Sequence, residues 1–137
     1  MSSRMGTMVR SFRDLRVYRK AFIIAREIYE ITKTWPKEEQ YAMSDQIRRS
    51  SRSVCANLAE AWRRRQYPKH FVSKLSDCTS EAAETRCWLD FAVDCKYISR
   101  SEYERLDATY DEIQGGLTNM LAHSHKWCAP SRREASK

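Results

Sequence analysis

Turn-forming residues are scarce in this sequence, and that scarcity limits the folds open to the chain more than any other feature. The 137 residues include only 3 glycines and 3 prolines, whereas Ala, Leu, Arg, Glu and Ser are abundant. A fold made of many strands needs frequent turns, and Gly and Pro mark most of them. The abundant residues mostly favour helices. The composition therefore predicts an all-α protein with short connections, and its length fits one domain.

Hydrophobic residues recur at steps of three and four along four segments, and this spacing predicts four amphipathic helices. The predicted helices cover residues 11–34, 37–65, 68–96 and 99–125. Capping-box sequences at Ser11 and Ser99 mark two of the starts, and Pro36 and Pro68 mark the other two. Gly115-Gly116 weakens the last helix and could bend it. Short connections favour an antiparallel up-down-up-down four-helix bundle.

Both ends of the chain are basic, and the C-terminal end is also polar with little apolar surface to bury. We expect residues 1–10 to be a flexible N-terminal segment, residues 11–125 to form the bundle, and residues 126–137 to be a disordered basic tail. No apolar run approaches the roughly 18 residues of a membrane span, and the first residues lack the apolar stretch of a signal peptide. These features predict a cytoplasmic protein with no membrane partner.

The first and third predicted helices carry more apolar surface than one packing seam requires. The first has two adjacent stripes, which are Leu15, Tyr18, Phe22, Ala25 and Tyr29 beside Val17, Ala21, Ile24, Ile28, Ile31 and Trp35. On the third, Trp88, Phe91 and Cys95 extend the apolar face. Soluble monomers rarely expose large apolar patches, so we expect a homo-oligomer with closed symmetry. The alternative is a wide core with scattered surface aromatics.

Several blocks of sequence resemble a known family. They are FRDLRVYRKA (12–21), WPKEEQY (35–41), QIRRS (46–50) and SVCANLAE (53–60). Their order and spacing resemble the four-helix-bundle family of 23S rRNA intervening-sequence proteins over residues 12–121. The chain is more distantly similar to the accessory variability determinant of diversity-generating retroelements, a basic bundle that partners reverse transcriptase and nucleic acid.

The resemblance implies a left-handed up-down bundle that assembles as a homopentamer, and that some bacteria encode within ribosomal RNA insertions. It implies no demonstrated activity. The chain departs from the usual family residues at Cys55, Ala61 and Asp77, and these departures leave the helical pattern intact.

Positive charge is concentrated in one stretch of the chain. The whole chain carries a net charge of +7, and residues 48–74 alone carry +7, whereas residues 75–125 carry −6. Planar guanidinium groups hold phosphate oxygens through paired hydrogen bonds, so this stretch predicts RNA or DNA binding on the second helix and the loop after it. The residues expected to bind are Arg48, Arg52, Arg63, Arg64, Arg65 and Lys69. The alternative is pairing of these arginines, within one subunit or between subunits, with acids of the third and fourth helices, such as Glu81, Glu84, Asp90, Asp107 and Asp111.

Other polar groups are interpreted as structural. The stripe of Gln46, Arg49, Asn57 and Glu60 is expected to form a partly buried network that orients neighbouring helices. No histidine follows a glutamate at the spacing of a di-iron bundle, no glycine-rich phosphate loop is present, and none of the five cysteines forms a C-x-x-C pair. We expect no metal, no cofactor and no enzymatic activity. The predicted function is a homo-oligomeric interaction protein that binds nucleic acid, and the alternative is a protein–protein scaffold without nucleic-acid contact.

Overall fold

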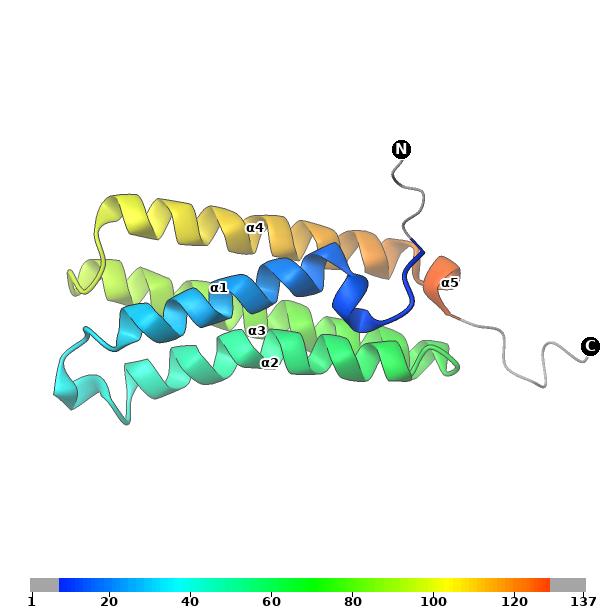
Figure 1. Cartoon of the computed structure of the whole chain (residues 1–137), viewed down its shortest axis with the longest axis horizontal. Coiled ribbons are helices and arrows are strands. Elements are labelled where there is room, and N and C mark those ends of the chain that lie inside the picture. The colour runs from blue at the N-terminus through cyan, green and yellow to red at the C-terminus, as the bar shows by residue number, and fades with distance from the viewer. Residues whose placement is uncertain (1–7, 129–137) are drawn as a thin grey trace, which may run out of the picture.

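Four long helices form the body of the molecule in the computed structural model, which describes residues 8–128 and has no strand in that range. Successive helices run in opposite directions and lie side by side (Figure 1), so the predicted up-down-up-down bundle is confirmed. The long helices are α1 (Arg16–Thr32), α2 (Met43–Arg63), α3 (Pro68–Asp94) and α4 (Arg100–Ala122). The short elements are the 3₁₀ turns η1 (Phe12–Asp14) and η2 (Lys37–Glu39) and the helix α5 (Ser124–Trp127).

The capping box at Ser11 is present, but it caps η1 and not α1. The Ser11 Oγ accepts a hydrogen bond from the Arg13 amide at 3.1 Å, and the Asp14 carboxylate accepts one from the Ser11 amide at 3.1 Å. Leu15 then has extended backbone angles, φ −67° and ψ 130°, and its side chain is 4% exposed. The start predicted for the first helix was therefore wrong, because the chain turns at Leu15 to place that side chain in the core before α1 begins at Arg16.

The second helix also begins later than predicted. Pro36 precedes η2, and α2 starts only at Met43. Glu39 is central to this connection, because its carboxylate accepts hydrogen bonds from the Met43 amide at 3.3 Å and from the Tyr97 hydroxyl at 2.9 Å. The connection is thus tied to the α3–α4 connection, a long-range contact at the point where the predicted helix is interrupted.

The starts predicted for the other two helices are confirmed. Pro68 occupies the first turn of α3. The Ser99 Oγ accepts a hydrogen bond from the Glu102 amide, and the Glu102 carboxylate accepts one from the Ser99 amide, both at 3.0 Å. α4 stays helical through both glycines, and a Cβ on Gly116 would lie 3.5 Å from the Val17 side chain of α1. Gly116 therefore lies where α1 and α4 meet.

The hydrophobic core runs the length of the bundle and follows the predicted faces. Six α2 residues spaced three or four apart are all buried, namely Met43, Ile47, Ser50, Val54, Leu58 and Ala61. The polar Ser50 is accommodated because its hydroxyl hydrogen bonds to the Thr85 hydroxyl of α3 at 2.7 Å. Part of the surplus apolar surface lies outside the core, since Phe22 and Phe91 are each 50% exposed. The oligomeric state that this surplus suggests stays a prediction.

The segment predicted to be a disordered tail begins with residues that are helical in the structure. Lys126 and Trp127, which were assigned to the tail, belong to α5. The Trp127 ring packs edge-on against Trp62 of α2, with centroids 6.1 Å apart. Residues 1–7 and 129–137, which make up most of the two predicted terminal segments, lie outside the described residues. None of the described helices combines the length and apolar character needed to cross a membrane.

Candidate nucleic-acid interface

The six basic residues predicted to bind nucleic acid lie in two separate places on the fold. Arg48 and Arg52 lie midway along α2 beside α1, whereas the other four surround the α2–α3 connection. Arg52 and Arg63 both belong to α2, and at 1.5 Å per residue they are about 16 Å apart along its axis. The predicted residues therefore do not make a single patch.

Arg48 and Arg52 are engaged with α1. Their guanidinium carbons lie 4.8 and 5.2 Å from the centroid of the Tyr29 ring, within the range of a cation–π contact. The Arg48 Nε also donates a hydrogen bond to the Thr32 Oγ1 at 2.7 Å. These contacts give the two arginines a structural role between α1 and α2, and we place the candidate interface at the other group.

The other four residues form a cluster that we call the basic turn, defined as Arg63, Arg64, Arg65 and Lys69. It lies at the end of the bundle that also carries η1 and α5 (Figure 1). The backbone there is closely hydrogen bonded, because the Arg64 amide donates to the Ala61 carbonyl at 2.9 Å and the Tyr67 amide donates to the Arg64 carbonyl at 2.8 Å. A short, fixed connection thus carries the cluster.

Within the basic turn, Arg65 differs from the rest. Its guanidinium carbon lies 3.6 Å from the centroid of the Trp62 ring, and its Nε donates a hydrogen bond to the Trp62 carbonyl at 2.9 Å. Desolvation lowers the pKa of Arg65, and the nearby Cys128 thiol acts in the opposite direction. Arg63, Arg64 and Lys69 are exposed. The basic turn therefore offers three exposed cations and one that is held on the bundle surface.

None of the six predicted residues forms an ion pair with any of the described residues. The acids proposed as their partners are occupied in part by Arg86 of α3. Its guanidinium donates two hydrogen bonds to the Asp107 carboxylate, at 2.7 and 2.9 Å, and one to Asp111 at 3.3 Å. Within the described residues of one chain, these arginines do not pair with the proposed acids, and pairing between subunits stays an open alternative. Arg86 was missed, although it is one of few basic residues in the acidic stretch 75–125.

The polar stripe of α2 is not the partly buried network that was predicted. Gln46, Arg49 and Glu60 are exposed, and among the described residues no hydrogen bond joins any two of the four stripe residues. Asn57 donates instead to the Ser53 carbonyl at 3.0 Å. The physical reason is the orientation of α2, which turns its Met43-to-Ala61 face into the core and leaves this flank open to water.

Aromatic side chains accompany the basic turn, and the sequence interpretation overlooked them. Tyr67 lies between Arg65 and Lys69 and is 56% exposed. Its ring centroid is 5.7 Å from that of His70, at an interplanar angle of 40°. The available signal was the position of an aromatic residue inside a run of cations, a pattern common in surfaces that bind single-stranded nucleic acid.

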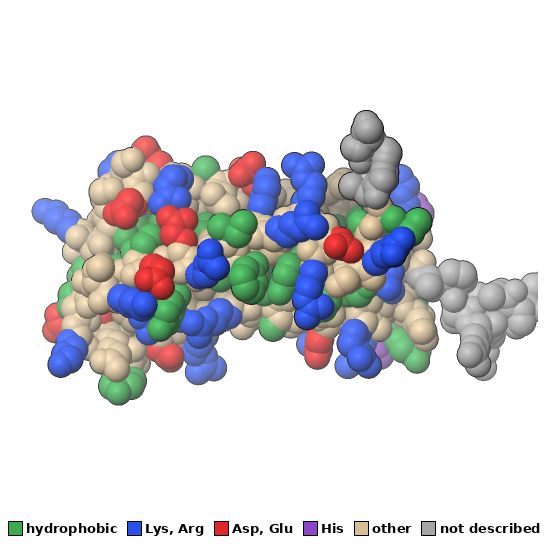
Figure 2. All heavy atoms as spheres, in the orientation of Figure 1, with side chains coloured by type: hydrophobic (Ala, Val, Ile, Leu, Met, Phe, Trp, Pro, Cys, Tyr) green, Lys and Arg blue, Asp and Glu red, His purple; other side chains and the backbone are tan. Residues whose placement is uncertain are grey.

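Two hollows lie along α1. A groove of about 470 Å³ between α1 and α2 is lined mainly by aromatic and small side chains, among them Phe22, Ala25, Cys55 and Ala59. Figure 2 shows hydrophobic side chains exposed on this face with Lys and Arg around them. Burial raises the pKa of the Cys55 thiol to about 11, which keeps it protonated and unreactive near neutral pH.

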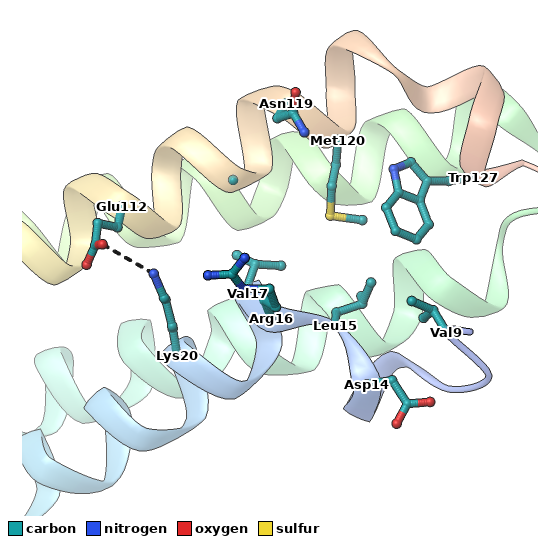
Figure 3. Close-up of a pocket in the computed structure, with 11 residues that line it drawn as sticks. Val9, Asp14, Leu15, Arg16, Val17, Lys20, Glu112, Asn119, Met120 and Trp127 are labelled. Atoms are coloured by element: carbon teal, nitrogen blue, oxygen red, sulfur yellow. Dashed lines mark hydrogen bonds and ion pairs between the residues drawn. The ribbon is translucent and has the colours of Figure 1, made fainter. Parts of the chain in front are cut away.

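The second hollow, of about 710 Å³, lies between α1 and α4 near α5 (Figure 3). Apolar side chains such as Val17 and Met120 line it, and Lys20 is paired with Glu112 at 3.3 Å across its rim. Neither hollow holds a cluster of acids or histidines. Among residues 8–128 no group of three or more His, Cys, Asp or Glu side chains is placed to bind a metal ion.

Comparison with known proteins agrees with the architecture. A curated-protein search finds no match. A solved structure from Bacteroides thetaiotaomicron VPI-5482, a protein of unknown function in the S23 ribosomal protein family, is similar with a TM-score of 0.70 and 33% identity; the match covers 77% of this chain and 95% of that one. The sequence model of the 23S rRNA-intervening sequence proteins matches residues 13–119. The chain therefore belongs to the family of 23S rRNA-intervening sequence proteins.

Proposed function

We propose that this protein is a non-enzymatic, cytoplasmic homo-oligomer that binds RNA through the basic turn. The observation that carries the proposal is the set of three exposed cations, Arg63, Arg64 and Lys69, none of which has an acidic partner among the described residues. Phosphate groups are the natural partners for such a cluster, because each contact releases counterions from the nucleic acid. The family name, which refers to ribosomal RNA, makes RNA the first ligand to test.

Three basic residues elsewhere on the bundle, unlike the basic turn, are paired with acids. Lys20 pairs with Glu112, Lys74 pairs with Glu60, and Arg86 is held by two aspartates. Those cations are already neutralised by the protein's own acids. The charge of the basic turn is therefore available to an external partner. In a symmetric oligomer the basic turn is repeated in every subunit, which would strengthen the positive electrostatic field.

The groove between α1 and α2 supports self-association. Its edge carries the half-exposed Phe22, and Arg26 and Arg52 are among its lining residues. On α3, the half-exposed Phe91 stacks beside Trp88, whose indole nitrogen donates to Glu84 at 3.2 Å. The aromatic pair of α3 lies beside an acid, and the apolar groove is flanked by arginines, so the two surfaces are complementary. In an oligomer, the aromatic pair of one copy would pack into the groove of another copy.

An RNA titration at two salt concentrations tests the proposal. Structured ribosomal RNA should bind the wild-type protein and bind it more weakly at the higher salt concentration. The double variant Arg63→Ala/Arg64→Ala should bind weakly while keeping its helical circular dichroism spectrum. The matched control is Lys37→Ala/Arg100→Ala, which removes two exposed cations at the opposite end of the bundle and should leave the affinity unchanged.

Three results would redirect the proposal. Undetectable or salt-insensitive binding by the wild-type protein would favour the protein–protein scaffold. Equal losses in the test and control variants would mean that overall charge, and not the basic turn, attracts the RNA. A stoichiometric metal in the purified protein would contradict the non-enzymatic assignment and require a search for activity.

A further inference from the structure

We infer that the basic turn selects unpaired nucleotides, and that one base stacks on Tyr67 while the neighbouring phosphates contact Arg64 and Lys69. This inference rests on the proposed RNA binding and specifies the class of RNA. The inference also requires more than charge attraction, because phosphate contacts alone would bind duplex and single-stranded RNA alike.

The placement of Tyr67 is the first step of the argument. Its amide donates to the Arg64 carbonyl at 2.8 Å, and its carbonyl accepts from the Phe71 amide at 2.9 Å, so both backbone polar groups are fixed. Pro68 follows directly and restricts the backbone further. The side chain nevertheless remains 56% exposed. A fixed backbone with an open aromatic ring makes a platform that loses little entropy when a ligand stacks on it.

The surroundings of Tyr67 are the second step. Arg64 and Lys69 flank it in the sequence and are both exposed, and the tilted His70 ring packs beside it. Tyr41 offers the opposite case. It is 87% exposed at the other end of α2, but the neighbouring residues include Glu38 and Glu39. Of these two exposed tyrosines, Tyr67 has both a face for a base and nearby cations for the phosphates.

Nucleic-acid chemistry supplies the third step. Bases in an A-form duplex are stacked on each other, and their faces are closed to a protein side chain. Unpaired bases in loops and single strands expose their faces, and stacking on an aromatic ring contributes roughly a 5- to 150-fold gain in affinity per base. The ring accepts any base, so we expect a preference for unpaired RNA with little preference for sequence.

The test compares two RNA probes, a short unstructured single strand and the duplex formed with its complement, against the full-length protein. Tyr67→Ala should lower affinity for the single strand by at least about 5-fold and leave duplex affinity unchanged. Tyr67→Phe keeps the ring and should restore single-strand binding. Tyr41→Ala is the matched control and should bind like the wild type. Circular dichroism spectra should show that all three variants keep the helical bundle.

The outcomes separate this inference from the proposed function. If Tyr67→Ala binds both probes like the wild type while Arg63→Ala/Arg64→Ala is impaired, the stacking inference is overturned and RNA binding by the basic turn stands. The stacking inference is also overturned if Tyr67→Ala weakens binding to both probes equally. If the arginine double variant binds both probes like the wild type, the proposed function itself fails.

Discussion

The salt dependence of RNA binding can be worked out from the basic turn. Arg63, Arg64 and Lys69 are exposed and have no acidic partner within residues 8–128, so they can neutralise phosphates, whereas Arg65 is held by its contact with Trp62. For single-stranded nucleic acid, the logarithm of affinity falls by about 0.7 per phosphate contact for each logarithmic unit of salt. Three contacts give a slope of about −2. Between about 50 and 200 mM salt, the affinity of one subunit should then fall by about 18-fold.

Removing two of these cations should flatten that dependence. In Arg63→Ala/Arg64→Ala one free cation remains, so the slope should approach −0.7 and the same salt change should cost only about 3-fold in affinity. Fluorescence anisotropy with a single strand short enough to contact one subunit measures the slope directly. The control Lys37→Ala/Arg100→Ala should keep the wild-type slope. An unchanged slope in the arginine double variant would refute the reasoning, because the phosphate contacts would then lie elsewhere.

Three further predictions concern the bundle itself. Arg86→Ala should lower the free energy of unfolding by about 2 kcal/mol in denaturant titrations, because the charge-assisted hydrogen bonds to the partly buried Asp107 are lost, whereas Arg105→Ala removes an exposed pair and should cost less than about 1 kcal/mol. An aromatic disulfide reagent near neutral pH should modify exposed Cys87 rapidly and Cys78 only on unfolding, since burial raises the pKa of Cys78 to about 12. Phe22→Glu should reduce the mass measured by light scattering, and an unchanged mass would exclude the α1–α2 groove as the contact between copies.

Local periodicity predicted the fold well, because the core faces depend on spacing within each helix. The α2 face from Met43 to Ala61 and the capping box at Ser99 both follow from residues close together in the sequence. The errors came from distant contacts. Leu15 interrupts the first helix to enter the core, and the Glu39–Tyr97 hydrogen bond holds the α1–α2 connection against the α3–α4 connection. Neither contact has a signal in the local pattern.

The candidate site was predictable in composition but not in arrangement. Charge counting found the basic residues of α2, yet it could not show that Tyr29 of α1 engages Arg48. It also could not show that Arg86 forms an ion pair with Asp107, because ion pairing depends on which helices are neighbours. Tyr67 was passed over because an exposed aromatic residue and a buried one look alike in sequence.

Ultraviolet crosslinking of the protein to RNA, followed by tryptic digestion and mass spectrometry, tests most directly whether the α2–α3 connection contacts RNA. We predict that the crosslinked nucleotide is found on the peptide 66–69, which contains Tyr67. The peptide 38–48, which contains the more exposed Tyr41, should stay free of it. Crosslinks on peptide 38–48 with none on peptide 66–69 would contradict the account.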